Sequence, residues 1–287
     1  SWLADNPGVE CGSVDNNNNA FDCLCCTGCT STTGTVLQEE MEFGNVVVAD
    51  GDVLAIGVDR QRESNARTDT QSAVHVYRKD AGSGLYVLEQ ELVSTLSYGT
   101  APNLRPVGTT QPVVFLMTDE GGSLAVSGNI IAMATTYGGV TVFVHDAGVW
   151  TQQPALVWPA DPDAASDTFG ETSVALSGSL LVVGDHLRDL PTDLCKSGNC
   201  NSMGAIYVFR TADAGATWTE VAMVNGADPA MFSNSGGMEF GKHIALSGNV
   251  LVGSALYAEG GKVSTAKGAN DRVGMAAVFT TDDGGDT

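Results

Sequence analysis

The sequence predicts an all-β fold, a β-propeller of four-stranded antiparallel blades with an N-terminal Cys-rich arm. Apolar hairpins recur along the 287 residues, and 35 glycines provide for tight turns between short strands. No convincing amphipathic helical stripe separates the strands, as a parallel α/β fold would require. These observations together favour repeated antiparallel sheets.

The clearest repeat is an apolar hairpin that occurs four times. Each copy has an apolar strand, a two-residue turn that ends in Gly, and a second apolar strand. Glycine allows the positive φ that such a turn needs. The four hairpins are Phe43–Val58, Glu120–Thr136, Phe169–Asp185 and Phe240–Ala255, with turns at Asp50-Gly51, Ser127-Gly128, Ser177-Gly178 and Ser247-Gly248.

A third strand follows every hairpin, and a fourth strand follows three of them. The third strands are expected at Ala73–Asp80, Gly139–Asp146, Gly204–Asp213 and Gly274–Asp283, and the fourth at Leu85–Val93, Val149–Trp158 and Thr217–Val224. One such sheet cannot bury both of its faces, so the sheets must pack against one another as propeller blades. The predicted blades are about 43–93, 120–158, 169–224 and 240–283.

The repeats resemble the FG-GAP family, which includes the head domain of integrin α chains. The resemblance rests on Phe43-Gly44, Phe169-Gly170 and Phe240-Gly241, and on the later run GAIYVF at 204–209. It implies a β-propeller over residues 35–287. The second unit departs from the pattern, with Glu120-Gly121 in place of Phe-Gly, and the calcium loop of the family is absent from all four units.

The last unit ends after its third strand, so its fourth strand must come from elsewhere. The segment Thr35–Met41 resembles a fourth strand and is expected to complete the last blade. The family usually forms seven blades, which leaves two alternatives open. Either a small propeller closes on itself, or a neighbouring part of a larger chain or assembly completes it.

Charge and cysteine usage restrict the partners and the location. The net charge of −21 argues against nucleic acid, and no apolar run is long enough for a membrane helix. Cysteine spacing favours disulfides in a secreted or cell-surface protein over zinc, and residues 1–34 are expected to form a disulfide-stapled arm. The seven cysteines are Cys11, Cys23, Cys25, Cys26, Cys29, Cys195 and Cys200, of which the last two are expected to pair, and the odd number leaves one thiol over.

Three long loops between second and third strands are expected on one face of the propeller, where they could bind an acidic partner. Their basic residues are Arg60, Arg62, Arg67, Arg188, Lys196, Lys262, Lys267 and Arg272. Solvated loops with locally paired charges are the alternative. A weak calcium site is possible at Asp161, Asp163 and Asp167, and no other cofactor is expected.

No Gly-x-Ser-x-Gly, HExxH or phosphate-loop motif occurs in the sequence, which leaves open a catalytic group assembled from several blades. The sequence therefore predicts an extracellular, non-enzymatic binding or structural module that contacts proteins, glycans or copies of itself. Two alternatives remain. One is a polysaccharide-acting enzyme, a lyase or hydrolase, on a propeller scaffold, and the other is a calcium-dependent adhesion module.

Overall fold

The computed structural model describes fifteen β-strands and, within the described residues, no helix. The described residues are 40–61, 72–95, 123–135, 139–154, 157, 159, 169–170, 173–191, 200–226, 237–258 and 274–280. In this part of the chain no helix has the length and apolar character needed to cross a membrane.

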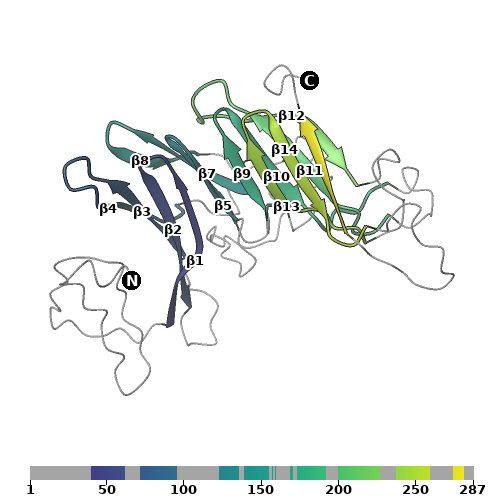
Figure 1. The fold of residues 1–287 in the computed structure, drawn as a ribbon, viewed down its shortest axis with the longest axis horizontal. Helices are drawn as coiled ribbons and strands as arrows, with labels where there is room; N and C mark the ends of the chain where they lie inside the picture. The colour runs from purple at the N-terminus through teal and green to yellow at the C-terminus, as the bar shows by residue number, and fades with distance from the viewer. Residues whose placement is uncertain are drawn as a thin grey trace.

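The strands form four antiparallel sheets, which are called blades 1 to 4 in chain order (Figure 1). Blade 1 contains β1 (Glu40–Asp50), β2 (Val53–Gln61), β3 (Ala73–Lys79) and β4 (Tyr86–Leu92). Blade 2 contains β5 (Leu124–Ser127), β6 (Ile130–Ala134), β7 (Val140–Asp146) and β8 (Val149–Gln152). Blade 3 contains β9 (Val174–Ser177), β10 (Leu180–Asp185), β11 (Ala205–Arg210) and β12 (Thr219–Asn225), and blade 4 contains β13 (Phe240–Ser247), β14 (Val250–Ala255) and β15 (Met275–Thr280).

The predicted fold class is confirmed. Strands follow one another in sheet order, as in propeller blades, and the strand pairs within each described sheet are antiparallel. The four predicted turn glycines all have positive φ, between 55° and 60°. Blades 1 to 3 have four strands each, whereas the described sheet of blade 4 has three.

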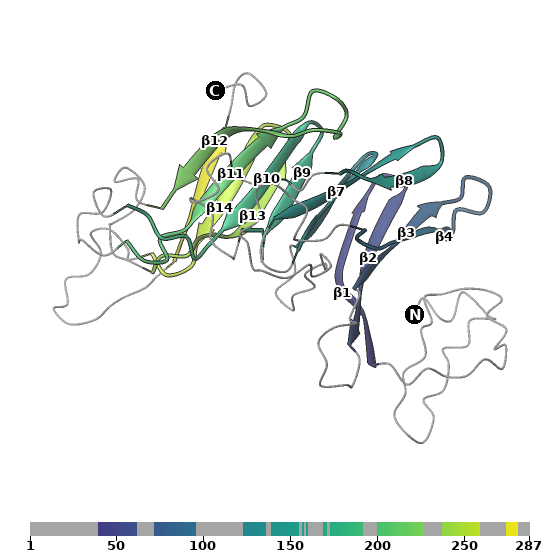
Figure 2. The ribbon, with the colours of Figure 1, turned by 180° about the vertical axis from the view of Figure 1, so that it is seen from behind.

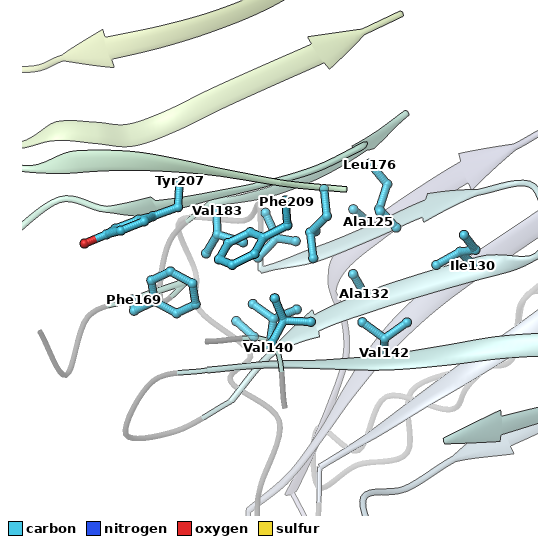
Figure 3. Packing of buried hydrophobic residues seen from close by; sticks show 14 of the residues in the cluster. Ala125, Ile130, Ala132, Val140, Val142, Phe169, Leu176, Val183, Tyr207 and Phe209 are labelled. Carbon is cyan, nitrogen blue, oxygen red and sulfur yellow. The ribbon is translucent and has the colours of Figure 1, made fainter. Parts of the chain in front are cut away.

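Successive blades pack face to face through apolar side chains. Three buried clusters lie between blades 1 and 2, blades 2 and 3, and blades 3 and 4. Figure 3 shows the middle cluster, in which Ala132 and Val142 of blade 2 face the sheet that carries Val183 and Phe209. Strand β10 has apolar neighbours on both sides, and for this reason all six of its residues are buried.

The two terminal blades differ from the inner blades because one face of each remains exposed. Blades 1 and 4 lie at opposite ends of the array in both views (Figures 1 and 2). Val278 of β15 is 65% exposed, and Val47 of β1 is 56% exposed. The corresponding strands of blade 3, β9 and β11, contain no exposed residue.

The hairpin turns of successive blades are linked by hydrogen bonds. In each case the turn glycine of one blade donates its backbone N–H to the side chain that precedes the turn glycine of the previous blade. These bonds are Gly128 N to Asp50 Oδ2 at 2.7 Å, Gly178 N to Ser127 Oγ at 3.0 Å, and Gly248 N to Ser177 Oγ at 2.9 Å. The Ser-Gly pattern therefore serves both the turn and the contact between blades.

The Phe-Gly dipeptides mark the entry to blades 3 and 4. Phe169 and Phe240 are both fully buried. Phe169 packs edge-on against Tyr207, with ring centroids 5.4 Å apart. The glycine after Phe240 has φ +89°, and a Cβ there would lie 2.5 Å from the carbonyl oxygen of Ala205. Only glycine fits this close approach of blade 4 to blade 3.

The expected role of Thr35–Met41 as the fourth strand of blade 4 is corrected for its described residues. Glu40 and Met41 pair with Gln61 and Arg60, and they therefore extend β1 in blade 1. The hairpin can lengthen because the backbone groups of β2 continue to offer partners to β1. Residues 35–39 and the predicted arm at 1–34 lie outside the described residues.

Candidate functional site

A carboxylate is fully buried at the end of β10. Asp185 has an exposed fraction of 0% and pairs with Ala205 at the start of β11. The same ladder position is Val58 in blade 1 and Ala255 in blade 4. Blade 2 has the buried polar residue Thr135 at the equivalent position, so Asp185 is the one acid in this series, and a buried acid needs polar partners.

Tyr207 lies next to this acid on β11 and is also buried. Figure 3 shows its ring beside Phe169 and its hydroxyl oxygen pointing away from the packed apolar side chains. Burial raises the pKa of Tyr207 to about 12; the charge of Arg188 opposes this shift, and the negative charges of Asp185 and Glu220 add to it. The phenol thus keeps its proton at neutral pH and can act as a hydrogen-bond donor or acceptor.

Arg188 contacts Tyr207 in two ways. Its Nη1 donates a short hydrogen bond to the tyrosine hydroxyl, and its Cζ lies 5.5 Å from the centre of the tyrosine ring. Only 8% of Arg188 is exposed, and Nε has no hydrogen-bond partner among the described residues. The backbone N–H of Arg188 also donates to the carbonyl of Asp185 at 3.3 Å, so one turn holds the two residues near each other.

The backbone of the connection between β10 and β11 holds these side chains in place. Leu190 N–H donates to the carbonyl of Cys200 at 3.1 Å, and Gly204 N–H donates to the carbonyl of Arg188 at 3.1 Å. The carboxylate of Asp189 accepts a hydrogen bond from the N–H of Ser202 at 2.8 Å and is exposed. The two sides of the connection are therefore tied together over the buried cluster.

His186 completes a group of four polar side chains, which we call the Asp185 cluster: Asp185, His186, Arg188 and Tyr207. His186 is 6% exposed and follows Asp185 directly. The cluster brings an acid, an imidazole, a guanidinium and a phenol to one end of blade 3. Such convergence of titratable groups is typical of functional sites.

A second polar group joins blades 1 and 2, but its contacts are structural. Glu89 accepts hydrogen bonds from Arg78 Nε at 2.7 Å and from Trp150 Nε1 at 2.9 Å. Burial alone would raise the pKa of Glu89, but these bonds and the charges of Arg78 and His145 hold it below its usual value. Gln90 exchanges two hydrogen bonds of 2.9 Å with the backbone of Trp150. Side chains fixed in this way act as a clamp between blades.

The predicted basic face is only partly described. Arg188 was expected on an exposed binding face, and this expectation is wrong, because the side chain is buried against Tyr207. Arg60 belongs to β2 through its backbone pairing with Met41. The remaining predicted residues, Arg62, Arg67, Lys196, Lys262, Lys267 and Arg272, lie outside the described residues.

The predicted cysteine and metal sites are also mostly outside the described part. Cys200 is buried and disulfide-bonded, with its Sγ 3.1 Å from the carbonyl oxygen of Pro191. Cys195 and the five N-terminal cysteines are not described, so their pairing stays a prediction. The same holds for Asp161, Asp163 and Asp167. Across the described ranges, no group of three or more His, Cys, Asp or Glu side chains is arranged to hold a metal ion.

The sequence motifs did not identify the Asp185 cluster. In the sequence, Asp185 and His186 resemble the first polar residues of a loop, and Tyr207 resembles one residue of an apolar strand. One signal was available: an acid aligns with Val58 and Ala255 when the hairpins are superimposed by their turns. The burial of that acid is visible only in the structure.

Comparison with solved structures yields a similarity to an enzyme. One matching structure is a GH43 endo-arabinanase from Bacillus licheniformis, with 11% sequence identity and a TM-score of 0.39, over 83% of this chain and 73% of that chain. The prediction of a non-enzymatic module, which rested on the repeat, the cysteine pattern and the missing catalytic motif, is corrected on this finding, because the similar protein is an enzyme. A similarity this low does not transfer the substrate or the active-site residues of that protein.

Comparisons of sequence identify a repeat family. Among curated proteins, none matches this chain. Residues 150–209 match the FG-GAP repeat family. This segment runs from β8 of blade 2 to β11 of blade 3 and contains Phe169-Gly170 and the turn at Ser177-Gly178. The resemblance predicted from the sequence is therefore confirmed: the chain contains an FG-GAP repeat within a β-propeller fold.

Proposed function

We propose that this protein is a polysaccharide-acting hydrolase and that the Asp185 cluster is part of its active site. The observation that carries the proposal is the fully buried carboxylate of Asp185, at a ladder position where other blades have Val58 and Ala255. A departure from the repeat that is costly for folding is expected where function requires it. Glycans as partners and an extracellular location are part of the same proposal.

Hydrolysis of a glycosidic bond uses two carboxyl groups, one that donates a proton and one that acts as base or nucleophile. Asp185 supplies the buried group. Asp189 supplies an exposed group on the same connection, where the Ser202 N–H fixes its carboxylate. Arg188 and Tyr207 act as positioning residues, because their contact with each other limits the movement of the chain between the two acids.

The test is release of reducing ends from a panel of neutral and acidic polysaccharides by the purified protein. We expect Asp185→Asn and Asp189→Asn each to reduce kcat by about 10²- to 10⁴-fold, the usual contribution of a proton-transfer group. Asp146→Asn is the matched control, since Asp146 lies exposed at the end of β7. Circular dichroism and thermal melting establish that each variant is folded.

The proposal fails if no polysaccharide in the panel is hydrolysed. It also fails if Asp185→Asn retains the activity of the Asp146→Asn control. Loss of activity in Asp185→Asn with an unchanged melting temperature would support it.

A further inference from the structure

An apolar groove of about 200 Å³ lies between blades 3 and 4. On blade 3 it is lined by Leu180, Val182, Val208, Ala222 and Val224. On blade 4 it is lined by Leu246, Leu251, Phe279 and Thr280, with Asn249 at the hairpin turn. It lies away from the Asp185 cluster, and none of the four cluster residues lines it.

The groove adjoins the strand edge at which blade 4 differs from the other blades. In blades 1 to 3 the third strand pairs with a fourth strand, as β11 does with β12. The third strand of blade 4, β15, pairs with β14 and with no other described strand. Its second edge thus offers backbone groups for pairing.

The register in which the second and third strands pair identifies equivalent positions in the four blades. The first residue of each second strand pairs with one residue of the third strand, and these pairs define the equivalence. They are Val53 with Arg78, Ile130 with Val144, Leu180 with Arg210, and Val250 with Thr280.

In the first three blades, the same third-strand residue pairs onward with the fourth strand. The partners are Val87, Thr151 and Thr219. The residue before each partner is aromatic in all three blades, namely Tyr86, Trp150 and Trp218. The fourth strands therefore begin alike, with one aromatic side chain at one fixed position.

The two tryptophans both pack against the blade that comes before their own. Trp150 of blade 2 is 2% exposed and belongs to the cluster that contains Val53, Ala55 and Val76 of blade 1. Tyr86 of blade 1 has no preceding blade among the described residues and is 38% exposed. The position is buried only where a preceding blade covers it.

Trp218 of blade 3 packs in the same way against the cluster that contains Ile130, Ala132 and Val142 of blade 2. In blade 3 the equivalent residues are Leu180, Val182 and Val208, by the register of the second and third strands. These three residues line the groove. The groove therefore occupies the place that the next aromatic residue in the series would fill.

We propose that this groove, together with the open edge of β15, is an acceptor site for an extended peptide strand of a partner. The strand carries Trp or Tyr directly before the residue that pairs with Thr280, places that ring against Leu180, Val182 and Val208, and pairs its backbone with β15. The partner strand would repeat the contacts of β8 and β12, so the site continues an interface that the protein already forms twice.

The test uses a peptide from this chain as the probe. A synthetic peptide with the sequence of residues 216–225 carries Trp218 and the apolar alternation of β12. We expect it to bind the intact protein and to slow hydrogen exchange at residues 275–280. The same peptide with Trp218→Ala should bind at least about tenfold more weakly, a loss of about 1.4 kcal/mol, because the buried aromatic side chain anchors the strand.

Substitutions in the protein test the location. Ala222→Phe fills the groove and should abolish peptide binding, because Ala222 lines it. Val221→Phe is the matched control: Val221 is the neighbouring residue of β12, is 41% exposed, and is not part of the lining. Circular dichroism verifies that both variants fold.

Four outcomes would overturn the proposal. The first two are equal binding of the two peptides and equal loss of binding in the Ala222→Phe and Val221→Phe variants. A third is slow exchange at 275–280 in the absence of peptide that is lost when Trp2, an aromatic residue of the N-terminal segment outside the described residues, is replaced by alanine, because the chain would then fill its own groove. The fourth is protection that rises with protein concentration together with dimer formation in light scattering, which would make a second copy the occupant.

Discussion

Replacement of Phe169 by alanine tests whether the Phe-Gly dipeptide stabilises the fold through packing. Phe169 is 0% exposed and packs edge-on against two aromatic rings of β11, with centroid distances of 5.4 Å to Tyr207 and 6.1 Å to Phe209. Truncation of a buried Phe costs about 3–5 kcal/mol, and the two edge-on contacts place Phe169→Ala at the upper end of that range. Phe43 provides a matched comparison, because it is only half-buried and its ring packs edge-on against His75, with centroids 5.8 Å apart.

The assay is urea denaturation of wild type, Phe169→Ala and Phe43→Ala, followed by circular dichroism and by tryptophan fluorescence. Trp218 packs against the same cluster as Phe169, so its fluorescence reports on the interface between blades 2 and 3. We expect Phe169→Ala to lose at least about 2 kcal/mol more than Phe43→Ala, since only the first leaves a fully enclosed cavity. Equal losses in the two variants would refute the argument that blade packing makes this dipeptide important.

Two further predictions concern a turn bond and a buried phenol. Ser177→Ala should lower the free energy of unfolding by about 0.5–1.5 kcal/mol, because Gly248 N–H loses its acceptor. The side chain of Ser247 has no partner among the described residues, so Ser247→Ala should leave the urea midpoint unchanged. Equal effects of the two substitutions would contradict the role of the turn bonds. Because the pKa of Tyr207 is about 12 in the folded protein and 10.0 without the fold, the unfolded state releases this proton first as pH rises. Wild type should therefore lose about 2 kcal/mol more stability than Tyr207→Phe between pH 10 and pH 12, measured by urea titration at each pH, and parallel pH profiles would be inconsistent with burial of the phenol.

The propeller architecture was predictable from the sequence because the same hairpin pattern occurs four times, so each copy supports the assignment of the others. Four Gly-containing turns at equivalent positions leave little freedom in strand register. The strands that flank the turns after Ser177 and Ser247 pair in the register that these turns set. The extension of β1 through Glu40 and Met41 was not predictable, since it depends on which strand edge is nearest in space.

The candidate site was less predictable than the fold. Arg188 is basic and lies in a long connection, and such residues are usually solvated, so the sequence placed it on the surface. Its burial follows from its contact with Tyr207, a residue 19 positions later on another strand. Tertiary contacts of this kind have no periodic signature in the sequence.

The hydrogen bonds between hairpin turns have a direction. Every link runs from a glycine N–H to the oxygen of the preceding unit, so the series has a donor end at Gly51 and an acceptor end at Ser247. Neither end group has a partner among the described residues. A further unit joined in register can attach its own glycine donor only at Ser247, or its own oxygen only at Gly51. Growth of such an array is therefore vectorial: a reversed unit at the first blade would set its own glycine N–H against the N–H of Gly51 and would lose the bond that links successive turns.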